Sequence, residues 1–127
     1  MKRMSFVSIP HTSQRYDTVG DYQDAHGCTL FTISEMPDER YEHLVALHEL
    51  VEKILVTARG VSDESIDQFD MAYEAARLPD NDSEPGDEPT APYHREHQFA
   101  TRLERMLAEE LGIDWEHYDT TVLGLSK

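Results

Sequence analysis

Hydrophobic residues in the first third of the chain occur in short runs of the kind that form strands. Residues 5–9 (SFVSI) and residues 28–34 (CTLFTIS) are rich in β-branched and aromatic side chains, and the residues between them include several turn formers. We therefore expect residues 1–35 to be β-rich, with two strands that pair antiparallel and room for a third short strand near residues 18–22.

Apolar residues later in the chain recur at helical spacing, which predicts three helices. The first, residues 37–59, opens with a proline and two acids, which suit the first turn of a helix, and is followed by a glycine. The second, residues 62–78, opens with a serine that can cap it, and the third, residues 93–111, also ends at a glycine. We expect the residues after 111 to form a helical turn and then an irregular end.

These elements indicate one α+β domain over residues 1–127, in which an N-terminal β-hairpin or small antiparallel sheet packs on a three-helix core. Residues 79–92 (PDNDSEPGDEPTAP) are acidic, rich in proline and free of basic residues, so we expect them to form a surface loop. No apolar run approaches the ~20 residues of a membrane span, so no membrane partner is expected.

The charge of the chain narrows the classes of partner. There are 26 acidic residues against 11 lysines and arginines, which gives a formal net charge of −15. This charge disfavours nucleic-acid binding and favours cation binding or docking on a basic protein. The single cysteine, Cys28, excludes an internal disulfide and fits a reducing, cytoplasmic compartment. The sequence sets no oligomeric state.

Ionisable residues stand inside the apolar arc of the first predicted helix, in the segment HELVE. At about 100° per residue, His48 and Glu52 fall between aliphatic positions, and Glu49 falls at the edge of the same arc. Burying an ionisable group costs several kcal/mol unless the group is paired or binds a metal. Replacing one partner of such a buried pair should therefore lower the free energy of unfolding by ~2–4 kcal/mol.

The other two predicted helices carry similar groups. His97 and Glu104 are seven residues apart on the third helix, so they lie on one face. Asp70 borders the apolar stripe of the second helix. Three explanations are open: the groups form a hydrogen-bonded structural network, they bind a metal ion, or the helices turn them toward solvent.

The metal hypothesis has a definite form. Two ligands at i and i+4 on one helix can reach one ion, as the histidines of HExxH helices do, and here the second histidine is a glutamate. Glu49 would act as general base on metal-bound water. A mixed nitrogen and oxygen site suits a divalent zinc, manganese or iron ion better than calcium. The predicted ligands, with the last two completing the site or orienting the others, are His48, Glu52, His97, Asp70 and Glu104.

Weaker patterns accompany this one. His94 forms an HxxH pair with His97 but lies on a wetter side of the helix. The ExxE and ExxD segments at residues 49–52 and 64–67 resemble those of all-α nucleotide pyrophosphohydrolases, which bind Mg²⁺ through four acids. The β-rich first third argues against that family. The HExxE helix after a β-hairpin also resembles the minimal zincin peptidase core at the level of fold.

Four longer segments, SIPHTSQRYDTVGDY, RYEHLVALHELVEKIL, IDQFDMAYE and EPGDEPTAPYHREHQFATRLER, resemble a family of small uncharacterised proteins of tailed bacteriophages and prophages. The resemblance implies a bacterial cytoplasm during infection and supplies no activity. Two functions are therefore expected as alternatives. One is a metal-dependent hydrolase acting on a peptide or phosphate ester. The other is a non-catalytic acidic accessory protein that binds a basic host protein and whose His/Glu cluster is structural.

Overall fold

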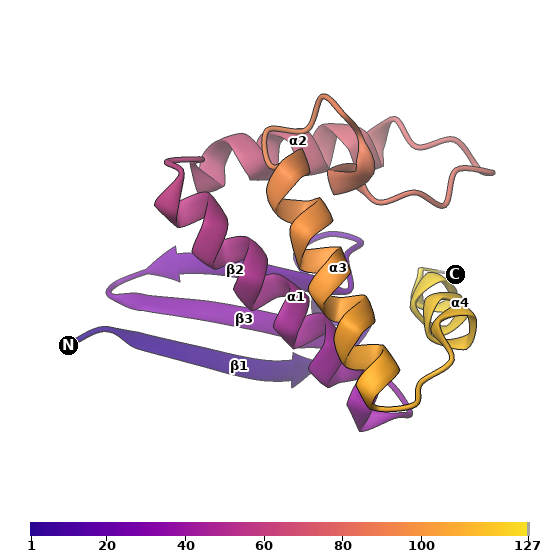
Figure 1. Ribbon diagram of the computed structural model, residues 1–127. Coiled ribbons are helices and arrows are strands. Elements are labelled where there is room, and N and C mark those ends of the chain that lie inside the picture. The colour runs from indigo at the N-terminus through magenta and orange to yellow at the C-terminus, as the bar shows by residue number, and fades with distance from the viewer. Residues whose placement is uncertain (127) are drawn as a thin grey trace.

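The computed structural model describes residues 1–126, which form a three-stranded mixed sheet covered by helices (Figure 1). The strands are β1 (Arg3–Ile9), β2 (Gly20–Ala25) and β3 (Cys28–Ser34), and β3 lies in the centre of the sheet. A short 3₁₀ turn, η1 (His11–Ser13), follows β1. The predicted α+β class is confirmed.

The hairpin of this sheet joins β2 to β3, which pair antiparallel. His26 and Gly27 connect them with φ of 53° and 73°, the paired positive values that suit a tight two-residue turn between twisted strands. The expected antiparallel pairing of residues 5–9 with residues 28–34 is wrong, because β1 and β3 run parallel. The chain reverses once into β2 and again into β3, so the first and third strands point the same way.

Four helices follow the sheet. They are α1 (Glu39–Ala58), α2 (Asp63–Ala75), α3 (His94–Glu110) and α4 (Trp115–Leu125), with a second 3₁₀ turn, η2 (Pro85–Asp87), in the acidic loop. The three predicted helices are present and end one to three residues inside the expected bounds, while the expected helical turn near the C-terminus is an 11-residue helix. Side chains of Asp38, Ser62 and Asp114 cap α1, α2 and α4 by accepting hydrogen bonds from first-turn amides.

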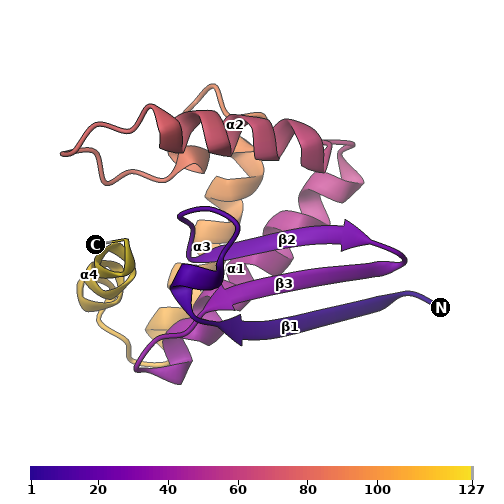
Figure 2. The ribbon, with the colours of Figure 1, turned by 180° about the vertical axis from the view of Figure 1, so that it is seen from behind.

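Helix α1 lies across one face of the sheet, and α3 runs alongside α1 (Figures 1 and 2). Helix α2 crosses the C-terminal end of α1 and the N-terminal end of α3, and α4 lies beside the other end of α3. In residues 1–126 no helix is both long enough and apolar enough to cross a bilayer.

The buried apolar side chains form two separate clusters. One holds Ile33, Leu44 and Ala108, and the other holds Phe31, Val56 and Tyr93. Helix α1 contributes to both clusters, whereas α3 contributes Ala108 to the first and begins directly after Tyr93 of the second. Between these contributions, each helix carries buried histidine and glutamate residues instead of hydrocarbon. The fold therefore contains a polar layer between two apolar ones, and this layer is where the candidate site lies.

Candidate metal centre

Three buried side chains from α1 and α3 converge on one point. The Nε2 atom of His48 lies 3.2 Å from Oε2 of Glu52 and 3.2 Å from Nδ1 of His97, and the last two atoms are 3.0 Å apart. The three residues are 6%, 5% and 4% exposed. Two nitrogen atoms and one oxygen atom thus form a nearly equilateral triangle that is shielded from bulk water.

The size of this triangle fits a divalent ion. Zinc binds histidine nitrogen and carboxylate oxygen at about 2.0–2.2 Å, which puts the ligand atoms of a tetrahedral site about 3.3 Å apart. The separations of 3.0–3.2 Å among the His48, Glu52 and His97 atoms are close to that spacing, so these three residues could hold such an ion.

The outer nitrogen atom of each imidazole faces a carboxylate. Nδ1 of His48 lies 2.8 Å from Oε1 of Glu104. Nε2 of His97 lies 3.1 Å from Glu84 and 3.2 Å from Asp87. If these outer nitrogens carry the hydrogen, the lone pairs of both inner nitrogens point at the centre of the triangle. Metal-binding histidines in proteins are oriented by carboxylates in this way.

Tyrosine hydroxyls hold two of these carboxylates. The Tyr118 hydroxyl donates to Oε2 of Glu104 at 2.6 Å, and the Tyr22 hydroxyl donates to Oε1 of Glu52 at 2.9 Å. In each of these two carboxylates, one oxygen therefore contacts a histidine and the other accepts a hydrogen bond from a tyrosine. Because both oxygens are engaged, the positions of the Glu52 and Glu104 side chains are fixed from two sides.

The acidic loop forms one wall of the centre. Glu84 and Asp87 flank Gly86, which packs directly against His97: a Cβ atom added at Gly86 would lie 2.4 Å from Cγ of the imidazole. One oxygen of Glu84 also lies within 4.8 Å of a ring nitrogen of His48 and of His97, so Glu84 is a further candidate ligand. From the sequence, residues 79–92 are expected only to form a surface loop, and neither Glu84 nor Asp87 is among the predicted ligands.

Asp70 lies apart from the triangle. Its carboxylate accepts hydrogen bonds from the hydroxyls of Tyr16, at 2.9 Å, and Tyr93. Tyr93 in turn stands edge-on to His97, with ring centroids 6.1 Å apart. Burial raises the pKa of Asp70 to about 6 in spite of these hydrogen bonds. Of the predicted ligands, the structure brings His48, Glu52, His97 and Glu104 together and separates Asp70 from them by one aromatic ring.

The remaining candidates have other surroundings. His94 bonds the backbone oxygen of Gly86 through Nδ1 and so supports the loop. Asp67, the last acid of the ExxE and ExxD pattern, pairs with Arg15. The sheet itself excludes the all-α fold on which that pattern depends.

Glu49 stands next to the triangle on α1 and is half-buried. Its side chain packs against the backbone of Gly20, where an added Cβ would lie 2.7 Å from Cγ of Glu49. Burial, followed by repulsion from Glu52, raises the pKa of the Glu49 carboxyl well above its usual value. A carboxyl that binds a proton readily beside a candidate metal position is suited to proton transfer.

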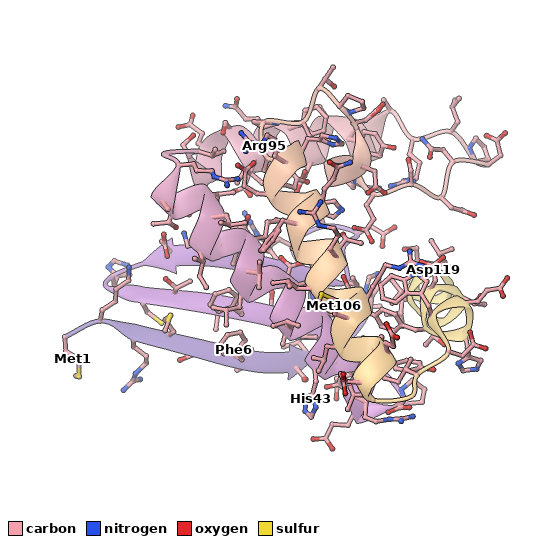
Figure 3. The ribbon with its side chains drawn as sticks, viewed as in Figure 1. Met1, Phe6, His43, Arg95, Met106 and Asp119 are labelled. Carbon is pink, nitrogen blue, oxygen red and sulfur yellow. The ribbon has the colours of Figure 1, made fainter. Side chains whose placement is uncertain are left out.

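A cleft of about 880 Å³ gives access to the centre. Side chains of the triangle and Glu49 line it, together with residues of the acidic loop and of α4. Figure 3 shows Asp119, on α4, on the side of the molecule that faces the acidic loop. The candidate site is therefore buried among helices on one side and reachable from solvent on the other.

In the absence of a metal ion, the surrounding carboxylates favour the protonated forms of His48 and His97. Burial opposes charge on His48, but hydrogen bonds with Glu104 and Glu52 outweigh it and raise the pKa of His48 well above its usual value. The pKa of His97 is raised in the same way by Asp87, Glu52 and Glu84. Burial opposes ionisation of Glu52, yet both histidines together lower its pKa to about 2. The metal-free site is thus a network of imidazolium and carboxylate groups, in which a divalent ion would replace protons.

Comparison of the chain with protein-family models, with curated proteins and with solved structures finds no match.

Proposed function

We propose that this protein is a metal-dependent hydrolase whose centre is the His48–Glu52–His97 triangle. The observation that carries the proposal is the convergence of two inner imidazole nitrogens and one carboxylate oxygen at separations of 3.0–3.2 Å. The same histidines could also be held by hydrogen bonds alone, because four carboxylates contact them: Glu52, Glu84, Asp87 and Glu104. The inward aim of three potential ligand atoms and the cleft beside them favour an ion.

A divalent zinc, manganese or iron ion would supply a Lewis acid that lowers the pKa of bound water toward neutrality. His48, Glu52 and His97 would hold the ion, and Glu84 would contact the outer nitrogen of His97. Glu104 and Asp87 would keep the histidines in the tautomer that binds metal. Glu49 would take the proton of the attacking water, because it lines the same cleft and readily binds a proton.

The proposed substrates follow from the chemistry that a metal-bound water can perform. A peptide bond and a phosphate ester are both cleaved by water activated on a metal ion. The resemblance to tailed-phage and prophage proteins supports a place for this activity in the cytoplasm of an infected bacterium. The net charge of −15 opposes a nucleic-acid substrate.

Metal titration tests the proposal. Protein purified without chelator should contain, or take up in calorimetry, about one equivalent of zinc, manganese or iron. His48→Ala and His97→Ala should each weaken the binding by at least ~100-fold. His43→Ala is the matched control, because His43 lies exposed on the same helix and should leave the affinity unchanged.

Activity is the second part of the test. A panel of generic peptide, carboxylic ester and phosphate ester substrates should be cleaved by the loaded protein and not by chelator-treated protein. Glu49→Gln should abolish turnover while it retains about one equivalent of metal. Less than about a tenth of an equivalent in the wild type, unchanged by His48→Ala, would overturn the hydrolase proposal.

A second function is favoured by one observation. Every buried side-chain nitrogen and oxygen atom within residues 1–126 has a hydrogen-bond partner without any ion. The cluster can therefore serve as a structural network in a non-catalytic accessory protein that binds a basic host protein through its negative charge. In that case metal would be absent and a defined basic protein partner would be released by high salt.

A further inference from the structure

Strand β1 leaves one edge of the sheet open. The sheet order is β1-β3-β2, so β1 pairs on one side only among the described residues. In Figures 1 and 2, no other element runs alongside its outer edge. Natural proteins protect such edges with charges, prolines or bulges, and residues Met4–Ile9 contain none of the first two. This edge is therefore a template for a further strand.

The backbone groups available at this edge can be identified. Arg3 donates its N–H to Gly27 and Ile9 accepts from Glu35, so both residues direct their backbone groups toward β3 or its ends. Successive residues of a strand direct these groups to opposite edges. The N–H and C=O groups of Met4, Phe6 and Ser8 consequently point outward.

The side chains at the edge are apolar and exposed. Met4 is 63% exposed and Phe6 is 45% exposed, although the Phe6 ring stacks on buried Phe31 with centroids 4.3 Å apart. Phe6 extends the apolar cluster under α1 beyond the part of the sheet that α1 covers. Figure 3 shows Met1 and Phe6 along this side of the sheet. Pairing with another strand would cover these side chains and complete the cluster.

The charges at the two ends of β1 differ in sign, and this difference favours one kind of partner strand. Residues 1–16 carry three basic residues and no acid, in a chain with 26 acids. Lys2 and Arg3 stand at the start of β1, whereas its end lies beside Glu42, which accepts a hydrogen bond from the Ser8 hydroxyl. A second β1 in antiparallel orientation would bring the basic start of one strand to the acidic end of the other. A parallel second copy would align like charges.

We propose that the protein forms a homodimer in which β1 of one copy pairs antiparallel with β1 of a second copy, centred on Phe6. In this register Phe6 faces Phe6 of the second copy and Met4 faces Ser8. These are the residues whose backbone groups point outward, so each pair can exchange two hydrogen bonds, about six in total. The two sheets would become one continuous sheet, and the two Phe6 rings would form a cross-strand pair.

Two matched substitutions test the dimer. Met4 on β1 and Met106 on α3 are 63% and 62% exposed, so replacing either by lysine removes a similar exposed side chain. Light scattering coupled to gel filtration, from micromolar to submillimolar protein, should give twice the 14.6 kDa chain mass for the wild type at high concentration. Met4→Lys should weaken association by roughly tenfold or more, and Met106→Lys should leave it unchanged.

Hydrogen exchange provides a readout that does not depend on a variant. The amides of Met4, Phe6 and Ser8 should exchange more slowly as the protein concentration rises, and the amide of Arg3, which is already bonded to Gly27, should change much less. A wild-type protein that keeps the mass of a single chain at all concentrations would overturn the proposal. A dimer that Met4→Lys and Met106→Lys weaken equally would overturn it as well, because the interface would then lie elsewhere.

Discussion

Gly86 lies directly against the imidazole of His97, and a Cβ atom at this position would meet ring atoms Cγ, Nδ1 and Cδ2 at 2.4, 2.6 and 2.8 Å. The ring is held on its other sides by Glu52, Glu84 and Asp87. A ring so enclosed has little room to move. The contact therefore links the acidic loop to the position of a candidate ligand.

Gly86→Ala should displace the His97 ring or the loop. We expect metal affinity to fall by about 10–100-fold and the free energy of unfolding to fall by ~1–3 kcal/mol, because the added methyl overpacks a buried contact. Calorimetric metal titration and urea unfolding measure the two effects. Gly124→Ala is the control: nothing lies within 4 Å of a Cβ there, and an alanine near the C-terminal end of α4 should change the free energy of unfolding by less than about 0.5 kcal/mol. Equal behaviour of the two variants would contradict the packing argument.

Glu52→Ala should destabilise the metal-free protein by ~2–4 kcal/mol, because it leaves His48, His97 and the Tyr22 hydroxyl without a shared buried partner. Chemical unfolding in the presence of chelator measures this loss. The control is Glu109→Ala on the exposed face of α3, where the same substitution should cost less than about 0.5 kcal/mol. A loss at Glu52 no larger than at Glu109 would mean that the network contributes nothing to stability.

The stability of the metal-free protein should fall as the pH rises above about 6.5. Folding raises the pKa of both His48 and His97, so their contribution is complete below the unfolded pKa of about 6.5 and is lost as the pH rises through the folded values. The pKa of Glu52 is lowered to about 2, so its contribution is present above the unfolded value and is lost only as the pH falls toward 2. Urea unfolding in chelator at several pH values checks this direction.

Metal should reverse that dependence. The histidines bind an ion only when their inner nitrogens are deprotonated, so affinity should increase with pH over the range in which the metal-free protein loses stability. Unfolding midpoints measured with and without zinc should therefore diverge as the pH rises from about 6 to 8. Parallel curves would indicate that zinc does not bind at the histidines.

Tyr118→Phe tests whether the surroundings of Glu104 tune His48. Removal of the hydroxyl leaves one oxygen of Glu104 without its 2.6 Å hydrogen bond. We expect a loss of about 1–2 kcal/mol in stability and a decrease of several-fold in metal affinity, since Glu104 then orients His48 less firmly. Tyr16→Phe serves as the control, because the Tyr16 hydroxyl likewise donates to a carboxylate, that of Asp70, which lies apart from the triangle. An unchanged affinity in Tyr118→Phe would remove Glu104 from the working site.

Helical periodicity was sufficient to place the central residues of the site. His48 and Glu52 lie one turn apart on α1, and His97 and Glu104 lie two turns apart on α3, so packing of α1 on α3 brought all four together. The two acids of the loop could not be found in this way, because a loop has no repeat that fixes side-chain direction. The capping box that Glu84 and Asp87 form around η2, just before the His97 helix, was the available local signal.

The strand pairing shows a similar limit. The residues of β2 (GDYQDA) are mostly polar or small, so their strand signal was weak, and without a full β2 the direction of β3 relative to β1 was inferred wrongly. The length of the C-terminal helix is a further difference, because the sequence predicts only a helical turn after residue 111. Helix α4 is stabilised by its Asp114 cap and by packing of Trp115 and Tyr118 on the core, neither of which periodicity over so few residues reveals.

The polar layer between the two apolar clusters has a consequence for how the molecule comes apart. Helix α1 and strand β3 contribute to both clusters, and the layer between the clusters is held by groups that attract one another only when their protons or an ion are correctly placed. Loss of that charge balance should therefore weaken the coupling between the clusters and broaden the melting transition. Occupancy of this layer thus governs cooperativity as well as chemistry.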